Sequence, residues 1–388
     1  MKLREDARAE GLRLLDWWAS HLVDDCGGFY GEVDADDRPV PEASKSIILN
    51  TRLLWFFSAM AGKGDARAAG LARRAADYIR TYFHDAEQGG LYWLLKADGR
   101  PEDTRKQAYA QAFAVYAFAE YYHATGDAAA LTFARDLQAL IEAKYWDSER
   151  GGYIEALNRA WNPPADQRLS DKDLDAPKTM NTHLHVLEAY SRLHGVAPTE
   201  DTRAALYRIL TVFLDRFVAP DGHLRLFFDM AWNDLTLSIS YGHDIEASWL
   251  IWEAAEALDD KALLERARPI VLALAGTARR EGMSEGGAFS YEKSFDGHTD
   301  PDGEWWEQAE ALVGFVNAWQ MTGEANWLEA AEKVWAYTKT QYGAGGVSEW
   351  TWYAASASKD KIYKAGQWKC PYHNGRAMIE VARQLRKT

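Results

Sequence analysis

Cysteine is scarce in this chain of 388 residues: only Cys26 and Cys370 occur, and neither belongs to a CxxC or Cys/His pattern. A disulfide framework and a cysteine-based metal site are therefore not expected. The N-terminal residues have no apolar signal core, and no apolar run approaches the length that crosses a bilayer. These absences predict a cytoplasmic protein without a membrane segment.

Phosphate-binding loops and excess positive charge are also missing. Neither GxxxxGK[ST] nor GxGxxG occurs, so the sequence indicates no nucleotide site. Acidic residues (58) outnumber Lys and Arg (44), and the net charge of −14 disfavours nucleic acid and anionic membranes as partners. We therefore expect no cofactor and no metal. A small-molecule substrate, and a monomer or weak homodimer, are expected as well.

What the sequence does contain is a glycine turn repeated six times. The turns lie about 60 to 70 residues apart, at Gly27-Gly28, Gly89-Gly90, Gly151-Gly152, Asp221-Gly222, Gly286-Gly287 and Gly345-Gly346. Units of this size cannot bury their apolar faces alone and must pack on their neighbours. We therefore predict one domain over residues 1–388.

Two kinds of helix alternate with the turns. Helices with one charged side are expected at 8–22, 66–83, 128–145, 201–217, 261–279 and 325–342, and helices that are apolar nearly all round at 47–60, 110–122, 184–193, 245–258, 309–319 and 376–385. Six half-buried and six fully buried helices predict an all-α (α/α)6 barrel, an inner ring inside an outer ring. Short β-hairpins, near 29–33 and 91–94, are expected over one mouth. The alternative, an open solenoid, would need polar capping units, and none is evident.

The polar residues at the starts of the six inner helices are the candidate site. In such a barrel these N-termini open at one mouth, where free N–H groups give a positive potential. Four of the ten histidines fall there: His183, His185, His243 and His373. Asn181 and His185, at i and i+4, share a helix face, whereas His183 diverges from His185. We therefore expect His185 to face the pocket and His183 to be structural, with no shared metal.

Several of these residues allow two interpretations. Arg52 is either a buried arginine paired with an acid or a guanidinium that holds a substrate oxygen. His243 and Glu246, at i and i+3, form either a structural pair or a base oriented by its carboxylate. Glu246 with Glu307 or Glu310 could also be the carboxylate pair of a glycoside hydrolase. The chain has 17 tryptophans, and those near the mouth suit the faces of sugar rings.

At these residues the chain resembles the N-acylglucosamine 2-epimerase superfamily, and within it the cellobiose 2-epimerases. The matching blocks are GGFYG (27–31), SIILNTRLLWFFS (46–58), KTMN (178–181), SYGHDIEA (240–247), WWEQAEA (305–311) and WKCPYHNGR (368–376). The resemblance implies an (α/α)6 barrel and metal-free inversion of C2 at the reducing-end sugar of a β-1,4-disaccharide. The connection 293–303, which would border the mouth, matches no family pattern.

The resemblance also implies roles for these residues. It makes His243 and His373 the acid/base pair and makes Arg52, His185, Glu246 and Glu310 the polar partners around the reacting carbons. Tyr109, Asn181, Trp249, Trp305, Trp306 and Trp368 are assigned to substrate binding, and the sequence does not decide whether Trp305 or Trp306 faces the sugar.

Inversion at C2 fits the chemistry of these side chains. The C2 proton is acidic only next to the open-chain aldehyde, and the enediolate that forms needs donors, which Arg52 and a protonated His185 can supply. Two histidines, with an ordinary pKa of about 6.5, can take and return the proton from opposite faces near pH 7. A D-mannose 2-epimerase or an aldose–ketose isomerase would share this intermediate. An (α/α)6 glycoside hydrolase and a sugar-binding protein without activity are further hypotheses for the same residues.

Overall fold

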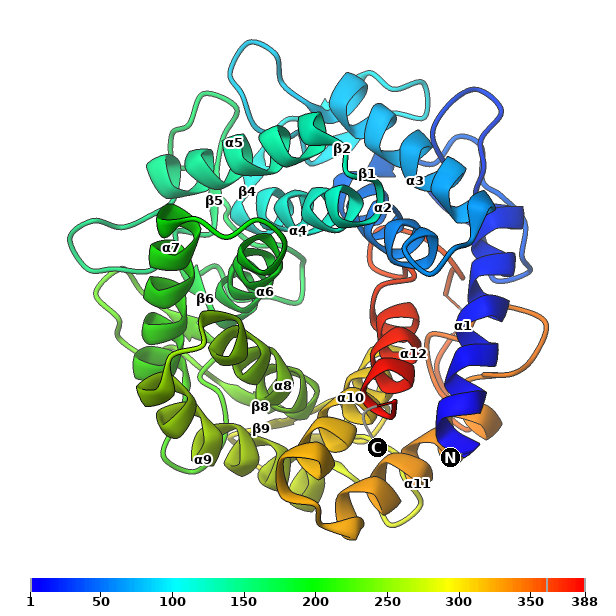
Figure 1. The fold of residues 1–388 in the computed structure, drawn as a ribbon, viewed down its shortest axis with the longest axis vertical. Coiled ribbons are helices and arrows are strands. Elements are labelled where there is room, and N and C mark those ends of the chain that lie inside the picture. The colour runs from blue at the N-terminus through cyan, green and yellow to red at the C-terminus, as the bar shows by residue number, and fades with distance from the viewer. Residues whose placement is uncertain (1, 361, 387–388) are drawn as a thin grey trace.

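The computed structural model describes residues 2–360 and 362–386 and shows two concentric rings of helices (Figure 1). The inner ring consists of α2 (Ile47–Ala61), α4 (Ala108–Thr125), α6 (Met180–Val196), α8 (Tyr241–Leu258), α10 (Trp305–Thr322) and α12 (His373–Gln384). The outer ring consists of α1 (Lys2–His21), α3 (Ala66–Tyr78), α5 (Ala128–Lys144), α7 (Glu200–Val212), α9 (Lys261–Thr277) and α11 (Ala325–Gln341).

The ring is closed, because α12 packs against α10 on one side and against α1 on the other. On α12, Gly375 lies so close to the ring of Phe56 on α2 that an added Cβ would come within 2.7 Å of it. The last inner helix therefore reaches the first. The predicted (α/α)6 barrel is confirmed, and the open solenoid is wrong.

Burial follows the two sequence patterns. Every residue of α2 from Ile47 to Met60 is buried, because an inner helix is covered by the outer ring on one side and by the barrel interior on the other. The outer helix α3 buries only one stripe, Ala68, Ala72, Ala75, Ala76 and Tyr78. Three outer helices end in one turn of π-helix, at Ile79–Phe83, Phe213–Phe217 and Ala278–Gly282.

Four inner helices begin three or four residues earlier than the apolar pattern predicts. They are α6, α8, α10 and α12, which start at Met180, Tyr241, Trp305 and His373. Their first turns carry polar side chains such as Asn181 and His243, so apolar periodicity does not detect them. The missed turns are the ones that face the site.

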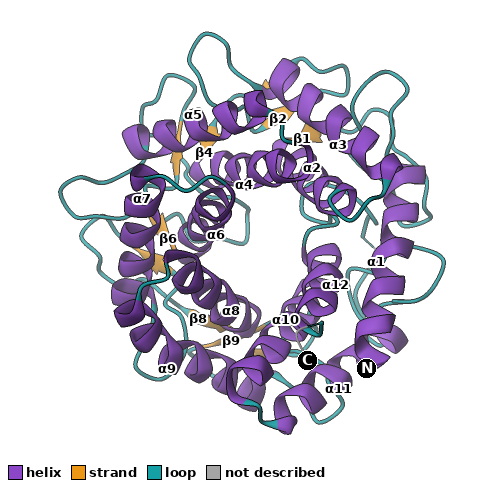
Figure 2. Cartoon of the chain, viewed as in Figure 1, coloured by secondary structure: helices purple, strands orange, loops and turns teal. Residues whose placement is uncertain are grey.

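The strands are short antiparallel pairs that lie at the starts of inner helices (Figure 2). They are β1 (Lys45–Ser46), β2 (Leu94–Leu95), β3 (Pro101–Asp103), β4 (Lys106–Gln107), β5 (Ala156–Leu157), β6 (Lys178–Thr179), β7 (Phe227–Phe228), β8 (Ser238–Ser240), β9 (Glu292–Ser294) and β10 (Thr299–Asp300). Their sheets are ordered β1-β2-β3, β4-β5, β6-β7 and β10-β9-β8. In β1–β2, Lys45 is opposite Leu95, and in β8–β9, Ile239 is opposite Lys293.

The expected strands at the mouth are therefore present. Segment 29–33 forms single bridges from Phe29 to Val23 and from Val33 to Pro39 rather than a full hairpin. The connection 293–303 contains the second strand of the hairpin β9–β10.

A lysine before three inner helices ties each helix start to a glycine turn. The Nζ atoms of Lys45, Lys106 and Lys178 lie 2.6, 3.1 and 2.7 Å from carboxylate oxygens of Asp24, Asp85 and Asp147, respectively. Each ammonium group also donates to the carbonyl of a turn glycine, Gly27, Gly89 or Gly151. These buried pairs hold the mouth in a fixed shape.

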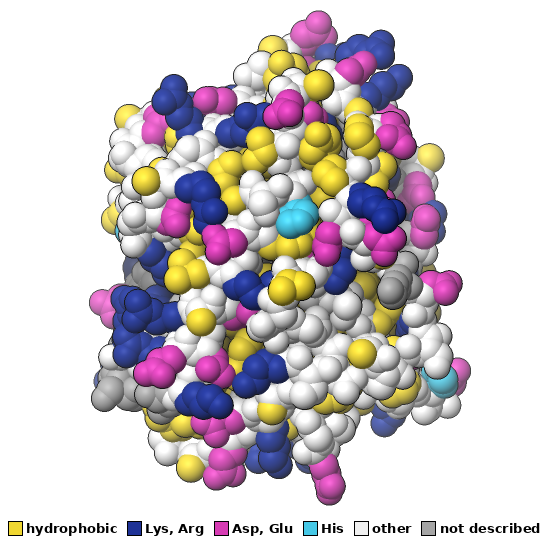
Figure 3. Space-filling view, turned by 90° about the vertical axis from the view of Figure 1, so that its right-hand side faces the viewer, with side chains coloured by type: hydrophobic (Ala, Val, Ile, Leu, Met, Phe, Trp, Pro, Cys, Tyr) yellow, Lys and Arg dark blue, Asp and Glu magenta, His cyan; other side chains and the backbone are white. Residues whose placement is uncertain are grey.

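The face of the molecule on the side of α1 is mixed in charge. On the side where α1 lies, side chains of both signs are interspersed among apolar ones (Figure 3). No helix in the described ranges combines the length and the apolar character that a membrane crossing requires.

Candidate active site

A cavity of about 220 Å³ opens at the mouth where the inner helices begin. Ten of the twelve predicted site residues line it: Arg52, Tyr109, Asn181, His185, His243, Glu246, Trp305, Trp306, Trp368 and His373. They come from all six units of the chain, so the barrel brings together residues that are far apart in sequence. Glu310 and Trp249 do not line it.

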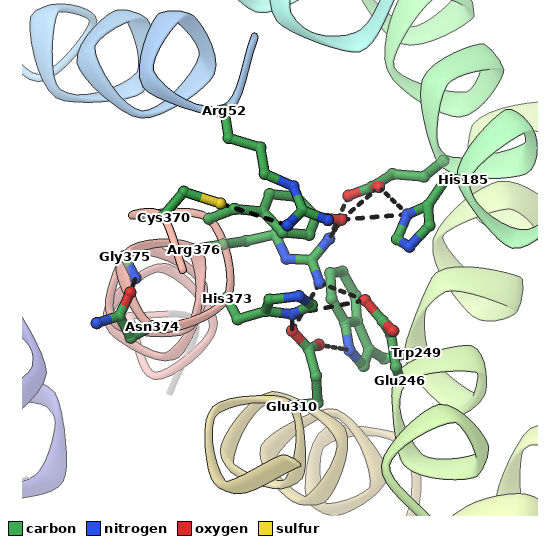
Figure 4. A network of polar contacts seen from close by, with 12 residues as sticks. Arg52, His185, Glu246, Trp249, Glu310, Cys370, His373, Asn374, Gly375 and Arg376 are labelled. Carbon is green, nitrogen blue, oxygen red and sulfur yellow. Dashed lines mark hydrogen bonds and ion pairs between the residues drawn. The ribbon is translucent and has the colours of Figure 1, made fainter. Parts of the chain in front are cut away.

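His373, on the first turn of α12, is held from behind by a carboxylate (Figure 4). Its Nδ1 lies 2.7 Å from Oε1 of Glu310 and 3.9 Å from Oε1 of Glu246. Burial, with Arg52 and Arg376 nearby, lowers the pKa of His373 well below its ordinary value. A neutral ring that donates from Nδ1 to Glu310 leaves the lone pair on Nε2 free to accept a proton.

His243, on the first turn of α8, has a different partner from the one that helical spacing suggests. Its Nδ1 lies 2.7 Å from Oγ of Ser240, and its ring contacts Trp306 at a centroid distance of 4.9 Å. Both interpretations of a His243–Glu246 pair are wrong, because Arg376 holds Glu246 instead. Burial lowers the pKa of His243 to about 3, so this ring too is neutral near pH 7.

Arg52 is buried without an acidic partner. Its Nη2 donates to the hydroxyl of Tyr109 at 2.7 Å and its Nη1 to Sγ of Cys370 at 3.3 Å. The guanidinium carbon lies 4.4 Å from the ring centroids of both Phe113 and Tyr372, where the aromatic faces stabilise its charge. The salt-bridge interpretation is wrong: no carboxylate of the described residues pairs with this arginine. Its positive charge is available to a ligand.

His185 faces the cavity and His183 lies behind it, as predicted. Nδ1 of His185 lies 3.0 Å from Oε2 of Glu188, which orients the ring. Nε2 of His183 accepts from the backbone N–H of Tyr153 at 2.8 Å, and its Nδ1 lies 2.7 Å from the carbonyl oxygen of Thr179. Both nitrogens of His183 are thus used by the fold, and burial lowers its pKa to about 3.

The sequence analysis missed Arg376, which binds carboxylates from three inner helices. Its Nη2 donates to Glu246 at 2.8 Å and to Glu310 at 2.7 Å, while its Nη1 donates to Glu188 and to the hydroxyl of Tyr372. Although burial opposes it, the charge of Arg376 helps to lower the pKa of Glu188 to about 2. The signal was present: Arg376 is three residues after His373 on one helix, so the two share a face.

The carboxylates of Glu246 and Glu310 and the ring of His373 offer ligand atoms within 4.8 Å of one another. A metal ion would fit such a donor set by residue type. Nη2 of Arg376, however, already donates to both carboxylates and supplies the positive charge at that place. Burial and the neighbouring Glu310 raise the pKa of Glu246 to about 7, which makes it a weaker ligand.

Trp249 and Glu310 lie below the cavity, which corrects two of the predicted assignments. Trp249 is six residues after His243 on α8, about 9 Å deeper along the helix. Its Nε1 donates to Oε2 of Glu310 at 3.1 Å, and its ring lies 4.7 Å from the guanidinium carbon of Arg376. Both residues therefore act on the lining from behind rather than on a ligand.

Glu307 also lies outside the cavity lining. It is fully buried, neither carboxylate oxygen has a hydrogen-bond partner among the residues that the structure describes, and burial raises its pKa well above the ordinary value. It packs where a Cβ at Gly242 would come within 2.5 Å of its Cγ. The carboxylate pair Glu246–Glu307 does not form in the pocket.

Both tryptophans at the start of α10 line the cavity. Trp306 lies against both histidines, with ring centroids 4.9 Å from His243 and 5.5 Å from His373. Trp305 is 2% exposed and packs edge-on against Trp352 at 4.6 Å. Trp306 therefore lies between the two histidines.

The sequence analysis also missed the part of the wall supplied by loops. Loop 158–177, between β5 and β6, contributes Leu169, Ser170, Lys172 and Asp173, and the opposite side contributes Tyr291, Glu304 and Trp352. Nζ of Lys172 lies 3.0 Å from Oε1 of Glu304, so one ion pair joins the third unit to the fifth across the mouth. No periodicity in the sequence indicates such a contact.

Comparison with known proteins gives a consistent result. Residues 28–377 match the family model N-acylglucosamine 2-epimerase (GlcNAc 2-epimerase). The chain is 42% identical over 378 residues to a cellobiose 2-epimerase of Bacteroides fragilis, with 95% of each chain covered. The structure of a cellobiose 2-epimerase from Bacillus thermoamylovorans superposes with a TM-score of 0.93 at 36% identity and covers 99% of each chain. A GH76 α-mannanase of Bacteroides thetaiotaomicron, with a TM-score of 0.67 at 13% identity, shares the fold alone.

Proposed function

The chain belongs to the N-acylglucosamine 2-epimerase family and is an isomerase, and we propose that it inverts C2 of the reducing-end glucose or mannose unit of β-1,4-linked disaccharides such as cellobiose and lactose. The observation that carries the proposal is the placement of His243 and His373. They come from different inner helices, line one cavity and contact the same ring, that of Trp306.

The reaction proceeds through the open-chain sugar. Once the ring has opened, one histidine removes the proton from C2, which is acidic next to the aldehyde. The other histidine then delivers a proton to the opposite face of the planar cis-enediolate, and C2 is inverted. The exchange balances when one histidine is neutral and accepts the C2 proton while the other has bound a proton from solvent and gives it up; the two roles are reversed in the back reaction. His373 is oriented for this by Glu310 and His243 by Ser240.

The negative charge of the enediolate needs hydrogen-bond donors that are already in place. Arg52 supplies a permanent charge with no carboxylate of the described residues to neutralise it, and Tyr109 and His185 line the same wall. Losing one such donor typically slows a reaction about 100- to 1000-fold. The scheme requires only proton transfers and hydrogen bonds, so we expect no cofactor and no metal.

The wall formed by loop 158–177 and Trp352 offers room for the second sugar of a disaccharide, and Trp306 and Trp368 offer flat apolar faces for sugar rings. A hydrolase would instead need two free carboxylates on either side of the bond. In this pocket Glu246 is held by Arg376 and Glu304 by Lys172, and Asp173 accepts hydrogen bonds from the backbone N–H and the hydroxyl of Ser170. We further expect a cytoplasmic monomer or weak homodimer.

The test is NMR of cellobiose, lactose, mannose and glucose incubated with the protein in D2O. We expect the C2 epimer of cellobiose and of lactose to appear with deuterium at C2. Deuterium at C1 together with a ketose product would indicate an aldose–ketose isomerase, and reaction of mannose alone a mannose 2-epimerase. Release of free glucose from cellobiose would contradict the proposal.

A further inference from the structure

A second cavity lies at the opposite end of the barrel axis, at the C-terminal halves of the inner helices, and its volume is about 530 Å³. We call it the rear chamber. All six inner helices contribute to its wall, as their arrangement around the axis in Figure 1 permits. It is within the size range of small-molecule sites in proteins. Nothing in the reaction proposed for the front pocket uses it.

The end of the rear chamber that points toward the front pocket is closed by aromatic side chains. Trp55, Tyr116 and Trp249 separate it from Arg376. Trp55 stacks on Tyr116 with an interplanar angle of 9° and a centroid distance of 5.4 Å. Since Trp249 donates to Glu310, only two side chains lie between this chamber and His373. The two cavities are thus separate.

The wall combines aromatic faces with both donors and acceptors. Two ion pairs are satisfied within it: Arg192 with Glu120 at 2.6 Å, and Arg383 with Glu380 at 2.5 Å. Trp252, Glu253 and Asn317 are partly exposed to it. Glu253 makes no hydrogen bond or salt bridge within the described part of the chain, and its burial raises its pKa.

A second, independent sign of an unfilled polar position is Trp55. It is 4% exposed, it lines the chamber, and its indole N–H has no hydrogen-bond partner among the described residues. A buried polar group without a partner destabilises a fold, so such a group is expected to meet water or a ligand. In the rear chamber this N–H group lies on a ring that stacks on Tyr116.

The charges narrow the class of ligand. Four carboxylates and the negative ends of six helix dipoles disfavour an anion. Arg192 and Arg383 are already paired with Glu120 and Glu380, and Lys63, which forms no ion pair among the described residues, supplies a positive charge that disfavours a free cation beside it. A neutral molecule with many hydroxyl groups can use both the acceptors and the donors, while its C–H faces lie on aromatic rings.

We propose that the rear chamber is a second carbohydrate site, which binds a neutral mono- or disaccharide against Trp252 with hydroxyl contacts to Glu253 and Asn317. It is distinct from the epimerase pocket and does not depend on the function proposed for that pocket.

The test is ¹⁹F NMR of protein labelled with 5-fluorotryptophan and titrated with cellobiitol or glucitol, which have no aldehyde and cannot react. Trp252→Phe and Trp368→Phe assign one resonance in each cavity, and Trp335, which binds Asp6 on the outer ring, gives a reference signal. We expect the Trp252 resonance to shift saturably with its own Kd, and to do so also in Arg52→Ala/Trp368→Ala, in which the front pocket is disabled.

Two variants check that the shift reports binding in the rear chamber. Glu253→Gln and Asn317→Ala, at partly exposed positions, should each weaken binding at the Trp252 signal about tenfold, since one hydrogen bond to sugar is lost. Both should leave the titration of the Trp368 resonance unchanged. The proposal is overturned if the Trp252 resonance does not move up to the solubility limit of both alditols, or if its shift disappears when the front pocket is disabled.

Discussion

Nδ1 of His373 lies 2.7 Å from Oε1 of Glu310, a carboxylate that itself does not reach the cavity. Because Arg376 and Trp249 donate to the same carboxylate, Glu310 is fixed from three directions. This relationship leaves Nε2 of His373 as the ring nitrogen without a carboxylate partner. It gives Glu310 a positioning role, whereas the resemblance alone had placed it among the groups around the reacting carbons.

Glu310→Gln should therefore impair turnover more than binding. The amide can present its NH2 group to Nδ1 and so favour the tautomer with the proton on Nε2, which cannot act as a base. We expect kcat to fall about 100- to 10,000-fold with a small change in KM. Steady-state epimerisation of cellobiose measures this. Glu329→Gln on the outer helix α11 is the control, and a KM effect alone would show that Glu310 contacts the substrate instead.

Arg376→Met should destabilise the fold as well as the site, because Glu188, Glu246 and Glu310 would remain buried without their shared cation. Breaking buried ion pairs in this way typically costs about 3–5 kcal/mol. Arg383→Met, on the same helix but half-exposed with one partner, should cost less than about 1 kcal/mol. Denaturant unfolding of both variants gives the comparison, and equal losses would contradict the role of Arg376.

The pH dependence of kcat/KM separates the histidines from Glu246. Burial lowers the pKa of His243 to about 3 and that of His373 well below its ordinary value, so both remain unprotonated bases well below pH 6.5. Glu246, with its pKa raised to about 7, changes charge near neutrality. We expect an ionisation near pH 7 that Glu246→Gln removes, and a histidine limb below about pH 5. A limb near pH 6.5 that survives in Glu246→Gln would mean that the histidines titrate normally.

The lowered pKa of the buried histidines should also make their contribution to the stability of the fold smaller in acid. Below pH 6.5 the unfolded chain binds protons at these histidines that the folded chain does not bind. The contribution of His183 and His243 to the free energy of unfolding therefore decreases as the pH falls from about 6.5 toward about 3, whereas a buried carboxyl group with a raised pKa, such as Glu246, contributes in the opposite direction below about pH 7. Urea unfolding at several pH values measures it. Activity loss in acid is thus interpreted only where circular dichroism shows the folded chain.

His243 and His373 should each serve one face of the intermediate. Replacing either with Ala should abolish epimerisation, while the remaining base still exchanges the C2 proton on its own side. In D2O, each single variant should then exchange C2 of only one epimer, and the two variants should exchange opposite epimers. Exchange from the same epimer in both would show that one histidine opens the ring and the other performs all C2 chemistry.

Substitutions of two tryptophans should affect different kinetic parameters, KM for Trp368 and kcat for Trp249. Trp368 lines the cavity, so Trp368→Ala should raise KM with a smaller change in kcat, because stacking stabilises bound substrate and transition state alike. Trp249 lies behind the cavity and donates to Glu310, so Trp249→Phe should lower kcat with little change in KM. A raised KM in Trp249→Phe would place that ring at the sugar after all.

The sequence by itself determined the ring and the location of the site. Each helix in this barrel contacts mainly its neighbours, so local periodicity was enough to find the outer helix at 128–145, observed as Ala128–Lys144. The glycine turns mark the same position in each unit. Equivalent positions in the units therefore converge at one mouth, and ten of the twelve predicted residues line one cavity.

Only the tertiary structure decided how deep each side chain lies in the barrel and which residues it pairs with. Spacing along a helix gives the face of a side chain, but how far the cavity extends down that face depends on how closely six helices approach one another. That is why Trp249 and Glu310 lie below the front cavity rather than in its lining. The partners of His243 and Glu246 were equally undetermined, since Arg376 on α12 is shared by carboxylates from α6, α8 and α10. A charge balance among four helices is set by their positions in space, and no single segment of sequence contains it.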